Sequence, residues 1–328
     1  MISSTRVRQL LPLVVSAIIV VFAGRALWRT LSHIALGDML AAFHQIPLFS
    51  VISAGLLVLA VYGALATYEA IVVRHIKADV HGFVAVVAGL AAAPIGHAMG
   101  WGALSGGAVR YRMYSNAGLR PLQIAKIAAL AAMPYAAGLG FVLGLALVLQ
   151  ADRAALLLRV EPSLARGAGL ALLALHAAYF TLVSTLKKPL QLGSLSVTLP
   201  PPSLTLIQYV IGSIEVFAGS GVLYALLPDS ANAPPYVVFV AVYVLCILAG
   251  LASSVPAGLG VFDGVLLFLL PQMPKASLVA SVLVYRFLLE AVPLILALVL
   301  FALFELKTRR DRAEPDSDVK SVNDSSSP

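Results

Sequence analysis

The segment Gly96–Tyr114, GHAMGWGALSGGAVRYRMY, places closely spaced glycines and two arginines, Arg110 and Arg112, between long apolar runs. Glycine allows the backbone to bend and lets neighbouring chains approach closely. A charged side chain at bilayer depth is costly, so it usually faces the protein interior or a water-filled cavity and marks a functional site. This segment therefore predicts a break in a membrane domain, with functional side chains at the break.

A second Gly-rich segment, Ser253–Asp263 (SSVPAGLGVFD), also lies between apolar runs and also ends in an ionisable residue. Two such interruptions at corresponding positions of two halves indicate a transporter binding site. Gly107 and Gly258 are about 150 residues apart, and the apolar run that begins near Ile46 has a counterpart near Leu204 at a similar offset. The sequence thus predicts two pseudo-repeated halves, either parallel or inverted.

The composition is that of a membrane protein. Of the 328 residues, 60% are hydrophobic and 11% are charged, and the mean hydropathy is +0.96. These values lie outside the usual range of soluble domains. The net charge of +7 comes from basic residues scattered over short loops, which favours membrane orientation and anionic headgroups over nucleic-acid binding.

The sequence contains no pattern for a cofactor or a catalytic centre. Cys246 is the single cysteine and lies in an apolar run, which excludes an intrachain disulfide and a cysteine metal cluster. The six histidines lack metal-binding spacing, and neither a P-loop nor a nucleophile elbow occurs. We therefore expect no metal, no cofactor and no enzymatic activity.

Eight apolar runs are long enough for a helical span, which needs about 20 residues. They are residues 10–28, 46–66, 81–100, 122–150, 167–186, 204–227, 235–252 and 276–304. The predicted fold is all-α and polytopic, with about eight spans and two Gly-rich segments that are re-entrant or broken. One membrane-embedded domain covers residues 1–310, and the polar residues 311–328 are expected to form a disordered tail.

The basic residues near both termini predict that both ends lie in the cytoplasm, because an even number of spans places them on one side. With eight simple crossings, the loops that carry Arg74 and Arg153 share that side. Arg110 and Arg112 then fall outside the cell unless the Gly-rich segment is re-entrant, which is tolerated only where protein or water surrounds it.

The motifs GHAMGWGALSGGAVRYRMYS and VPAGLGVFD resemble signature segments of the flippase domain of the bifunctional lysylphosphatidylglycerol flippase/synthetases, the multiple peptide resistance factor family, and of its stand-alone relatives. The resemblance covers about residues 46–310, although Ala98 stands where the family has Asn, and no synthase domain follows. It implies a stand-alone flippase of the bacterial inner membrane. The implied substrate is phosphatidylglycerol or its aminoacyl form, and the implied protein partners are a second copy or a separately encoded synthase.

The first Gly-rich segment offers donors for a lipid phosphate. Arg110 and Arg112 carry guanidinium forks suited to phosphate oxygens, and the backbone amides of Gly106 and Gly107 could bind the same anion. His97 could line the cavity. For the two arginines the alternative is interfacial anchoring to headgroups, a role also expected for Tyr111 and Tyr114.

Five more ionisable residues complete the candidate substrate site. Glu215 lies near the middle of a span and needs a cavity or a basic partner, for which Arg286 is the candidate. Arg286 and Glu290 are four residues apart and can pair on one helical face, as a structural ion pair or a gate. Asp263 can bind a cation, pair with an arginine or cap a helix, and Glu69 is placed at a membrane edge.

The sequence therefore predicts a lipid flippase whose arginines take the phosphate and whose carboxylates compensate a cationic headgroup, while two halves rock around the site. Two alternatives remain at this stage. One is a membrane scaffold or accessory subunit for a separate lipid-modifying enzyme, and the other is an aminoacyl-lipid synthase.

Overall fold

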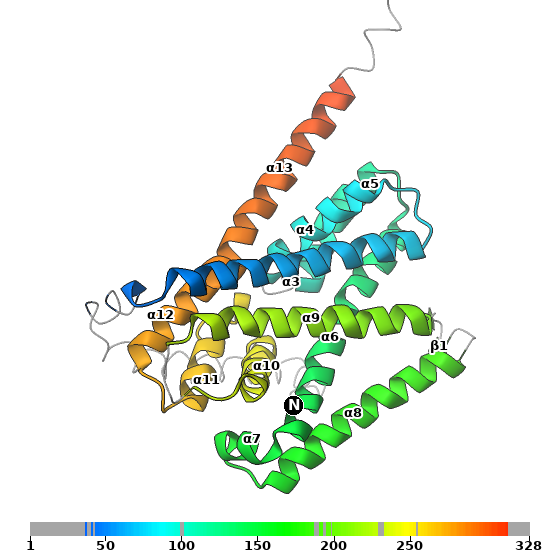
Figure 1. Ribbon diagram of the computed structural model, residues 1–328. Helices are drawn as coiled ribbons and strands as arrows, with labels where there is room; N and C mark the ends of the chain where they lie inside the picture. Colours follow the sequence, from blue (N-terminus) through cyan, green and yellow to red (C-terminus); the bar gives the residue numbers. More distant parts are fainter. Residues whose placement is uncertain are drawn as a thin grey trace, which may run out of the picture.

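The structure is a computed structural model that describes residues 37, 41, 43–98, 102–186, 190–192, 195–197, 199–228, 233–253 and 255–313. This part of the chain is almost entirely helical, with one short antiparallel β-hairpin (Figure 1). The predicted first span, 10–28, lies outside the described residues, and so does 314–328 of the predicted tail. Residues 311–313 of that tail instead continue the last helix.

The elements follow one another in a fixed order. They are α3 (Leu48–His75), α4 (Gly82–Ala98), α5 (Gly102–Asn116), α6 (Pro121–Leu149), α7 (Ala151–Leu158), α8 (Pro162–Thr185), β1 (Leu190–Leu192), β2 (Leu195–Val197), α9 (Pro202–Leu226), α10 (Tyr236–Ser253), the 3-10 turn η1 (Pro256–Gly258), α11 (Val261–Leu269), α12 (Lys275–Arg286), the π-helical turn η2 (Phe287–Ala291) and α13 (Val292–Ala313). Proline begins α6, α8 and α9, where a missing N–H breaks no helical hydrogen bond.

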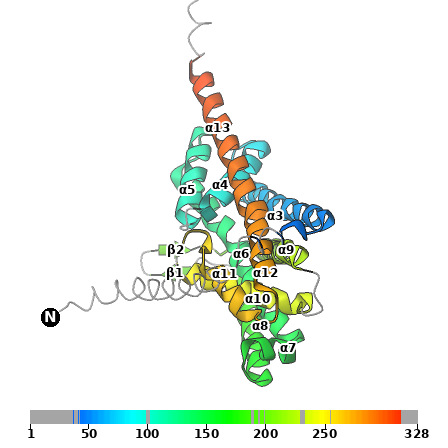
Figure 2. The same cartoon turned by 90° about the vertical axis from the view of Figure 1, so that its left-hand side faces the viewer.

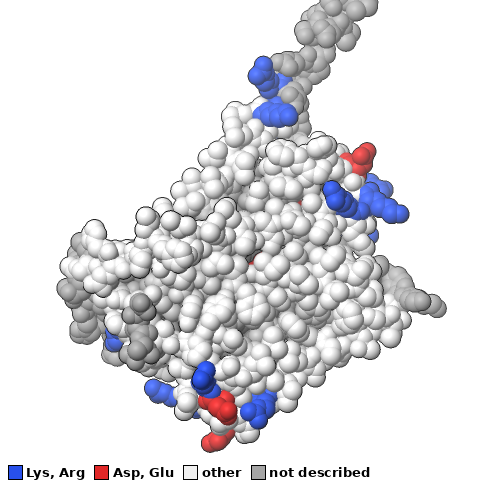
Figure 3. All heavy atoms as spheres, viewed as in Figure 1, with Lys and Arg blue, Asp and Glu red and all other residues white. Residues whose placement is uncertain are grey.

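Six of the described helical segments are long and apolar enough to span a membrane: α3, α6, α8, α9, α10 and the continuous stretch Lys275–Thr308. Large apolar side chains on them, among them Leu56, Leu175 and Leu298, are exposed. Figure 3 shows charged side chains gathered near α7 and the start of α8 and near the end of α3, with a broad face almost without charge between them. The chain is a polytopic membrane protein, and the predicted count of eight spans is not confirmed.

Helices α3 and α9 form the centre of the fold. They lie side by side and run in opposite directions, as the colour gradient in Figure 1 shows, and α6 packs against both. The crossing of α6 and α9 is so close that a Cβ added at Gly212 would overlap the carbonyl oxygen of Pro134. Only glycine fits there, which fixes the middle of α9 against the middle of α6.

Helices α4 and α5 form a helical hairpin. They pack against each other, and Val80, just before α4, belongs to the same core cluster as Leu119, just after α5. Both outer ends of the hairpin therefore lie at the same end of the fold. His97, near its inner end, packs edge-on against Tyr135 in the middle of α6, with ring centroids 5.8 Å apart.

Helices α10 and α11 form a second hairpin. Ala233, just before α10, and Met273, beyond α11, belong to one core cluster. The start of α10 and the end of α11 therefore lie at the same end of the fold. At its inner end, Ala257, Gly258 and Gly260 have positive φ values of 52°, 60° and 77°. The predicted break in the second Gly-rich segment is confirmed, because these left-handed conformations lie between the end of α10 at Ser253 and the start of α11 at Val261.

The two hairpins enter from opposite ends of the fold. The core cluster of the α4–α5 hairpin includes Leu204, at the start of α9, whereas that of the α10–α11 hairpin includes Leu226, at its end. We call these the Leu204 end and the Leu226 end. Helix α4 also contacts η1 and η2, so the inner parts of the two hairpins meet between the ends.

This arrangement corrects one prediction. Residues before Lys77 pack at the Leu204 end, whereas α7, which contains Arg153, packs at the Leu226 end. The two basic loops therefore lie at opposite ends and do not share a side. The physical reason is that the apolar run 81–100 is one arm of a hairpin, although its length and composition resemble those of a full span. Helix α13 leaves the Leu204 end beside α4 (Figure 2).

Candidate functional site

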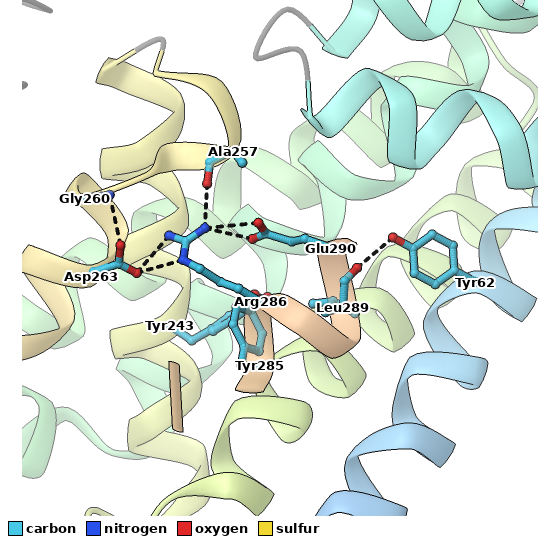
Figure 4. A network of polar contacts seen from close by, with 9 residues as sticks. All are labelled: Tyr62, Tyr243, Ala257, Gly260, Asp263, Tyr285, Arg286, Leu289 and Glu290. Atoms are coloured by element: carbon cyan, nitrogen blue, oxygen red, sulfur yellow. Dashed lines mark hydrogen bonds and ion pairs between the residues drawn. The ribbon is translucent and has the colours of Figure 1, made fainter. Parts of the chain in front are cut away.

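An ion network centred on Arg286 lies where the two hairpins meet (Figure 4). Its Nε and Nη2 donate to Oδ1 of Asp263 at 3.0 and 2.8 Å, and its Nη1 donates to both carboxylate oxygens of Glu290 at 3.1 Å. Nη1 also donates to the carbonyl oxygen of Ala257 at 3.2 Å. One guanidinium thus joins α11, η1 and η2, and the predicted pair of Arg286 with Glu290 is confirmed.

The backbone around this network is shaped to hold it. Oδ2 of Asp263, the third residue of α11, accepts the N–H of the N-cap residue Gly260 at 2.9 Å, so Asp263 closes the first turn of α11 and pairs with an arginine at the same time. On the other side, the Tyr62 hydroxyl donates to the carbonyl oxygen of Leu289 in the π-helical turn at 2.9 Å. Such turns widen a helix locally and are frequent at functional sites.

Aromatic rings support the network from the Leu226 end. The Arg286 guanidinium lies 5.6 Å from the centroid of Phe262, which stacks on Tyr285 at 5.8 Å with nearly parallel rings. The Tyr285 hydroxyl in turn lies 2.9 Å from that of Tyr243 on α10. A cation over a ring face and satisfied phenol groups both favour a rigid, defined geometry.

The network carries more negative than positive charge and is partly accessible. Asp263 and Glu290 are two carboxylates against one guanidinium, so the ionised set has a net charge of −1. The side chain of Glu290 is 33% exposed, whereas those of Arg286 and Asp263 are 10% and 15% exposed. Because this turn lies near the middle of the span Lys275–Thr308, the surplus carboxylate could bind a cationic group at mid-membrane depth.

A second ion cluster, closed to solvent, holds the α4–α5 hairpin to α3. Glu69 is 1% exposed and accepts hydrogen bonds from Nε and Nη2 of Arg110 at 2.9 and 2.8 Å and from the Tyr114 hydroxyl at 3.0 Å. A Cβ added at Gly89 on α4 would come within 2.9 Å of the Glu69 Cβ. Glu69 and Tyr114, which were predicted at membrane edges, are buried inside the protein, where Arg110 pairs the Glu69 charge.

Arg112 has a different partner from Arg110. Its Nε and Nη2 donate to Glu305 of α13 at 2.6 and 2.7 Å, and its side chain is 43% exposed. Residues two apart on a helix face different directions, so the structure does not bring the two arginines to one anion. Gly106 and Gly107 lie inside α5, where backbone amides beyond the first turn donate within the helix. They cannot form the predicted anion-binding loop.

Glu215 is buried apart from both clusters. It is 6% exposed near the middle of α9, and its Oε1 is completely buried without a hydrogen-bond partner. The predicted pairing with Arg286 is not present. Among the residues that the structure describes, Glu215 forms no ion pair with any side chain.

The structure brings together several predicted residues and adds others. Asp263, Arg286 and Glu290 form one site, whereas the contact that the structure gives for His97 is with Tyr135 of α6. Sequence reasoning missed Tyr62 and Glu305 as partners, since each is separated from its contact by about 200 residues and carries no local motif. For Tyr62, the one available sequence signal was a polar hydroxyl in the middle of an apolar run. In the described part of the chain no cluster of three or more metal-ligating side chains occurs.

The fold and site define a helical membrane protein in which two hairpins from opposite ends meet at a partly accessible ion network. No family model matches the chain. An uncharacterized protein of Synechocystis sp., slr0712, is 27% identical over 311 residues, which cover 94% of this chain and 96% of that protein. The inner membrane protein YbhN of Escherichia coli is 28% identical over 214 residues, 64% of this chain and 66% of that protein.

A third relative is named for a lipid reaction. Phosphatidylglycerol lysyltransferase of Staphylococcus xylosus is 30% identical over 112 residues, which cover 34% of this chain and 13% of that protein. Counterparts of Staphylococcus aureus show 33% identity over 103 residues. These similarities support the predicted resemblance in part, and they agree with a membrane protein.

Proposed function

We propose that this protein is a flippase that carries the headgroup of phosphatidylglycerol, or of its aminoacyl form, across the inner membrane of a bacterium. The observation that carries the proposal is the Arg286 network: charged groups near the middle of a span, with Glu290 partly exposed, between hairpins from opposite ends. Ionisable groups are retained at that depth chiefly on substrate or ion pathways.

The arrangement of the halves supports alternating access to this site. The order of a long helix, a hairpin of two helices and a long helical segment that contains a proline occurs in α3–α6 and again from α9 to α13. The first helices of the two sets, α3 and α9, are antiparallel (Figure 1), which favours inverted over parallel halves. In inverted-repeat transporters the substrate site lies at the repeat interface, and one repeat moves against the other around it. Each hairpin would then open the site to one side.

The chemistry of the network fits a headgroup with both charge signs. The Arg286 guanidinium is suited to a phosphate oxygen, and the surplus carboxylate of Glu290 is suited to an amine such as that of a lysyl group. The partial similarity to phosphatidylglycerol lysyltransferase supports this lipid class. Glu69, Arg110 and Arg112 take structural roles in this proposal, because Arg110 with Glu69 and Arg112 with Glu305 are one-to-one ion pairs that leave no surplus carboxylate.

The charge distribution supports a cytoplasmic Leu204 end. Basic residues are more numerous there, as the positive-inside rule requires. On described helices and loops they are Arg74, Lys77, Arg120, Lys126, Lys307, Arg309, Arg310 and Arg312, against Arg153, Arg159, Arg166 and Lys275 at the Leu226 end. The C-terminal end of α13 would therefore lie in the cytoplasm.

Headgroup accessibility in liposomes tests the function. Purified protein is expected to speed the crossing of lysylphosphatidylglycerol and phosphatidylglycerol over that in protein-free liposomes, with phosphatidylcholine as the comparison lipid. Glu290→Gln is expected to remain folded, because Arg286 keeps its ion pair with Asp263. Its translocation rate for the lysyl lipid is expected to fall at least about tenfold, the equivalent of 1.4 kcal/mol. Its rate for phosphatidylglycerol should fall less. If no lipid crosses faster than in protein-free liposomes, the flippase proposal fails.

A further inference from the structure

Glu215 is a buried carboxyl that the ion network does not use. It lies near the middle of α9, is 6% exposed, and has a completely buried Oε1 without a hydrogen-bond partner. In these surroundings an ionised carboxylate would have little contact with solvent and no ion-pair partner among the described residues, and in practice such a group binds a proton and becomes neutral. Its place at mid-membrane depth makes a purely structural role costly.

The groups that face Glu215 do not supply a positive charge. Helix α3 contributes the phenols of Tyr62 and Tyr68, and α6 contributes the phenol of Tyr135, all within electrostatic range of the carboxyl. Helices α8, α10 and α12 also pack against α9, and α12 carries Arg286, which pairs with Asp263 and Glu290 instead. No described basic side chain therefore forms an ion pair with Glu215.

We propose that Glu215 is a proton-binding site at the middle of the membrane, occupied in this conformation and emptied in another during the transport cycle. The coupling to transport rests on the proposed lipid translocation, whereas the binding of the proton does not. This assigns a role to the candidate carboxylate that neither ion cluster uses, and it names a proton gradient as the energy source.

Two features connect Glu215 to the rest of the fold: the crossing of α6 with α9, and Tyr62, which contacts the π-helical turn. Gly212, one turn before Glu215, forms the close crossing with Pro134, which adjoins Tyr135. Any change in the angle between α6 and α9 at this crossing therefore changes the surroundings of the carboxyl. Tyr62 lies within electrostatic range of both Glu215 and Glu290, and its hydroxyl is bonded to the π-helical turn that carries Glu290. Movement of either carboxylate therefore changes the electrostatic surroundings of the Tyr62 hydroxyl.

Carbodiimide labelling tests the proton directly. Dicyclohexylcarbodiimide adds to a protonated carboxyl in an apolar environment: the acid proton moves to a reagent nitrogen, the carboxyl oxygen bonds the central carbon, and rearrangement leaves a stable N-acylurea. At pH 7.5 an ordinary glutamate is protonated in only about one molecule in a thousand. Peptide mass spectrometry on the purified protein is expected to find at least about tenfold more label on Glu215 than on Glu69 or Asp263, which are held in ion pairs.

The label on Glu215 should fall as the pH of labelling is raised, and Glu215→Asp should retain a labelled site that Glu215→Gln lacks. Absence of label on Glu215 at every pH, or equal label on Glu69, overturns the proposal.

In proteoliposomes, an imposed pH gradient is expected to change the wild-type translocation rate several-fold, a response that Glu215→Asp keeps and Glu215→Gln loses. An undiminished response in Glu215→Gln overturns the coupling. If the wild-type protein moves no lipid but Glu215 is labelled, the flippase proposal is wrong and the proposal of a proton-binding site is supported.

Discussion

Replacing Arg286 with glutamine is expected to destabilise the protein by about 3–5 kcal/mol, the range measured when one partner of a buried ion pair is removed. The substitution leaves Asp263 and Glu290 as adjacent carboxylates without a counter-charge, and the Ala257 carbonyl without its donor. The effect is measured as a lower midpoint of thermal unfolding in detergent and a smaller monodisperse fraction after purification.

A neutral version of the network separates folding from function. The triple variant Asp263→Asn, Arg286→Gln, Glu290→Gln removes all three charges while retaining polar groups of similar shape. It is expected to recover most of the lost stability, since replacing a whole buried ion set is often nearly neutral, and to remain inactive in lipid translocation. An Arg286→Gln protein as stable as wild type would show that these charges are not buried together.

Arg110→Gln is expected to cost a similar amount, about 3–5 kcal/mol, for the same physical reason. It leaves Glu69, 1% exposed, with the Tyr114 hydroxyl as its remaining donor. The double variant Glu69→Gln, Arg110→Gln should regain stability. Unlike the neutral version of the Arg286 network, it should also retain lipid translocation, because this cluster is closed to solvent and joins helices.

Arg112→Gln is the matched control on the same helix. Arg112 is also paired with a glutamate, but its side chain is 43% exposed, and exposed ion pairs contribute little to stability. Its unfolding midpoint should stay close to that of wild type. Loss of translocation in the folded Glu69→Gln, Arg110→Gln double variant, with Arg112→Gln active, would assign the substrate to the Glu69 cluster instead.

Much of the fold could be predicted because the bilayer imposes strong rules on the sequence. The long apolar runs predict the spanning helices, and Pro256, Gly258 and Gly260 predict the break that the positive φ values confirm. The pair Arg286 and Glu290 could be predicted because a helix brings residues four apart onto one face.

The remaining features depend on contacts between distant segments. Arg110 and Glu69 are 41 residues apart in the sequence, and Arg286 and Asp263 are 23 apart, so no local spacing identifies these partners. A hairpin arm and a spanning helix also have the same apolar composition, which is why the run 81–100 was predicted to cross the membrane. Whether the Glu215 carboxyl has a hydrogen-bond partner depends on which residues of other helices surround it, and no single segment of the sequence contains that information.

The central claim is that a lipid headgroup meets the Arg286 network in the middle of the membrane, and cysteine accessibility tests it most directly. Cys246 is buried and is the chain's single cysteine, so Glu290→Cys in a Cys246→Ala background provides one reporter thiol at the partly exposed position. We predict that it reacts with a membrane-impermeant thiol reagent, and that phosphatidylglycerol, whose anionic headgroup Arg286 can still bind, slows the reaction more than phosphatidylcholine does. A thiol at this position that reacts no faster than one introduced by Val244→Cys, which is 0% exposed, or that neither lipid protects, would contradict the account.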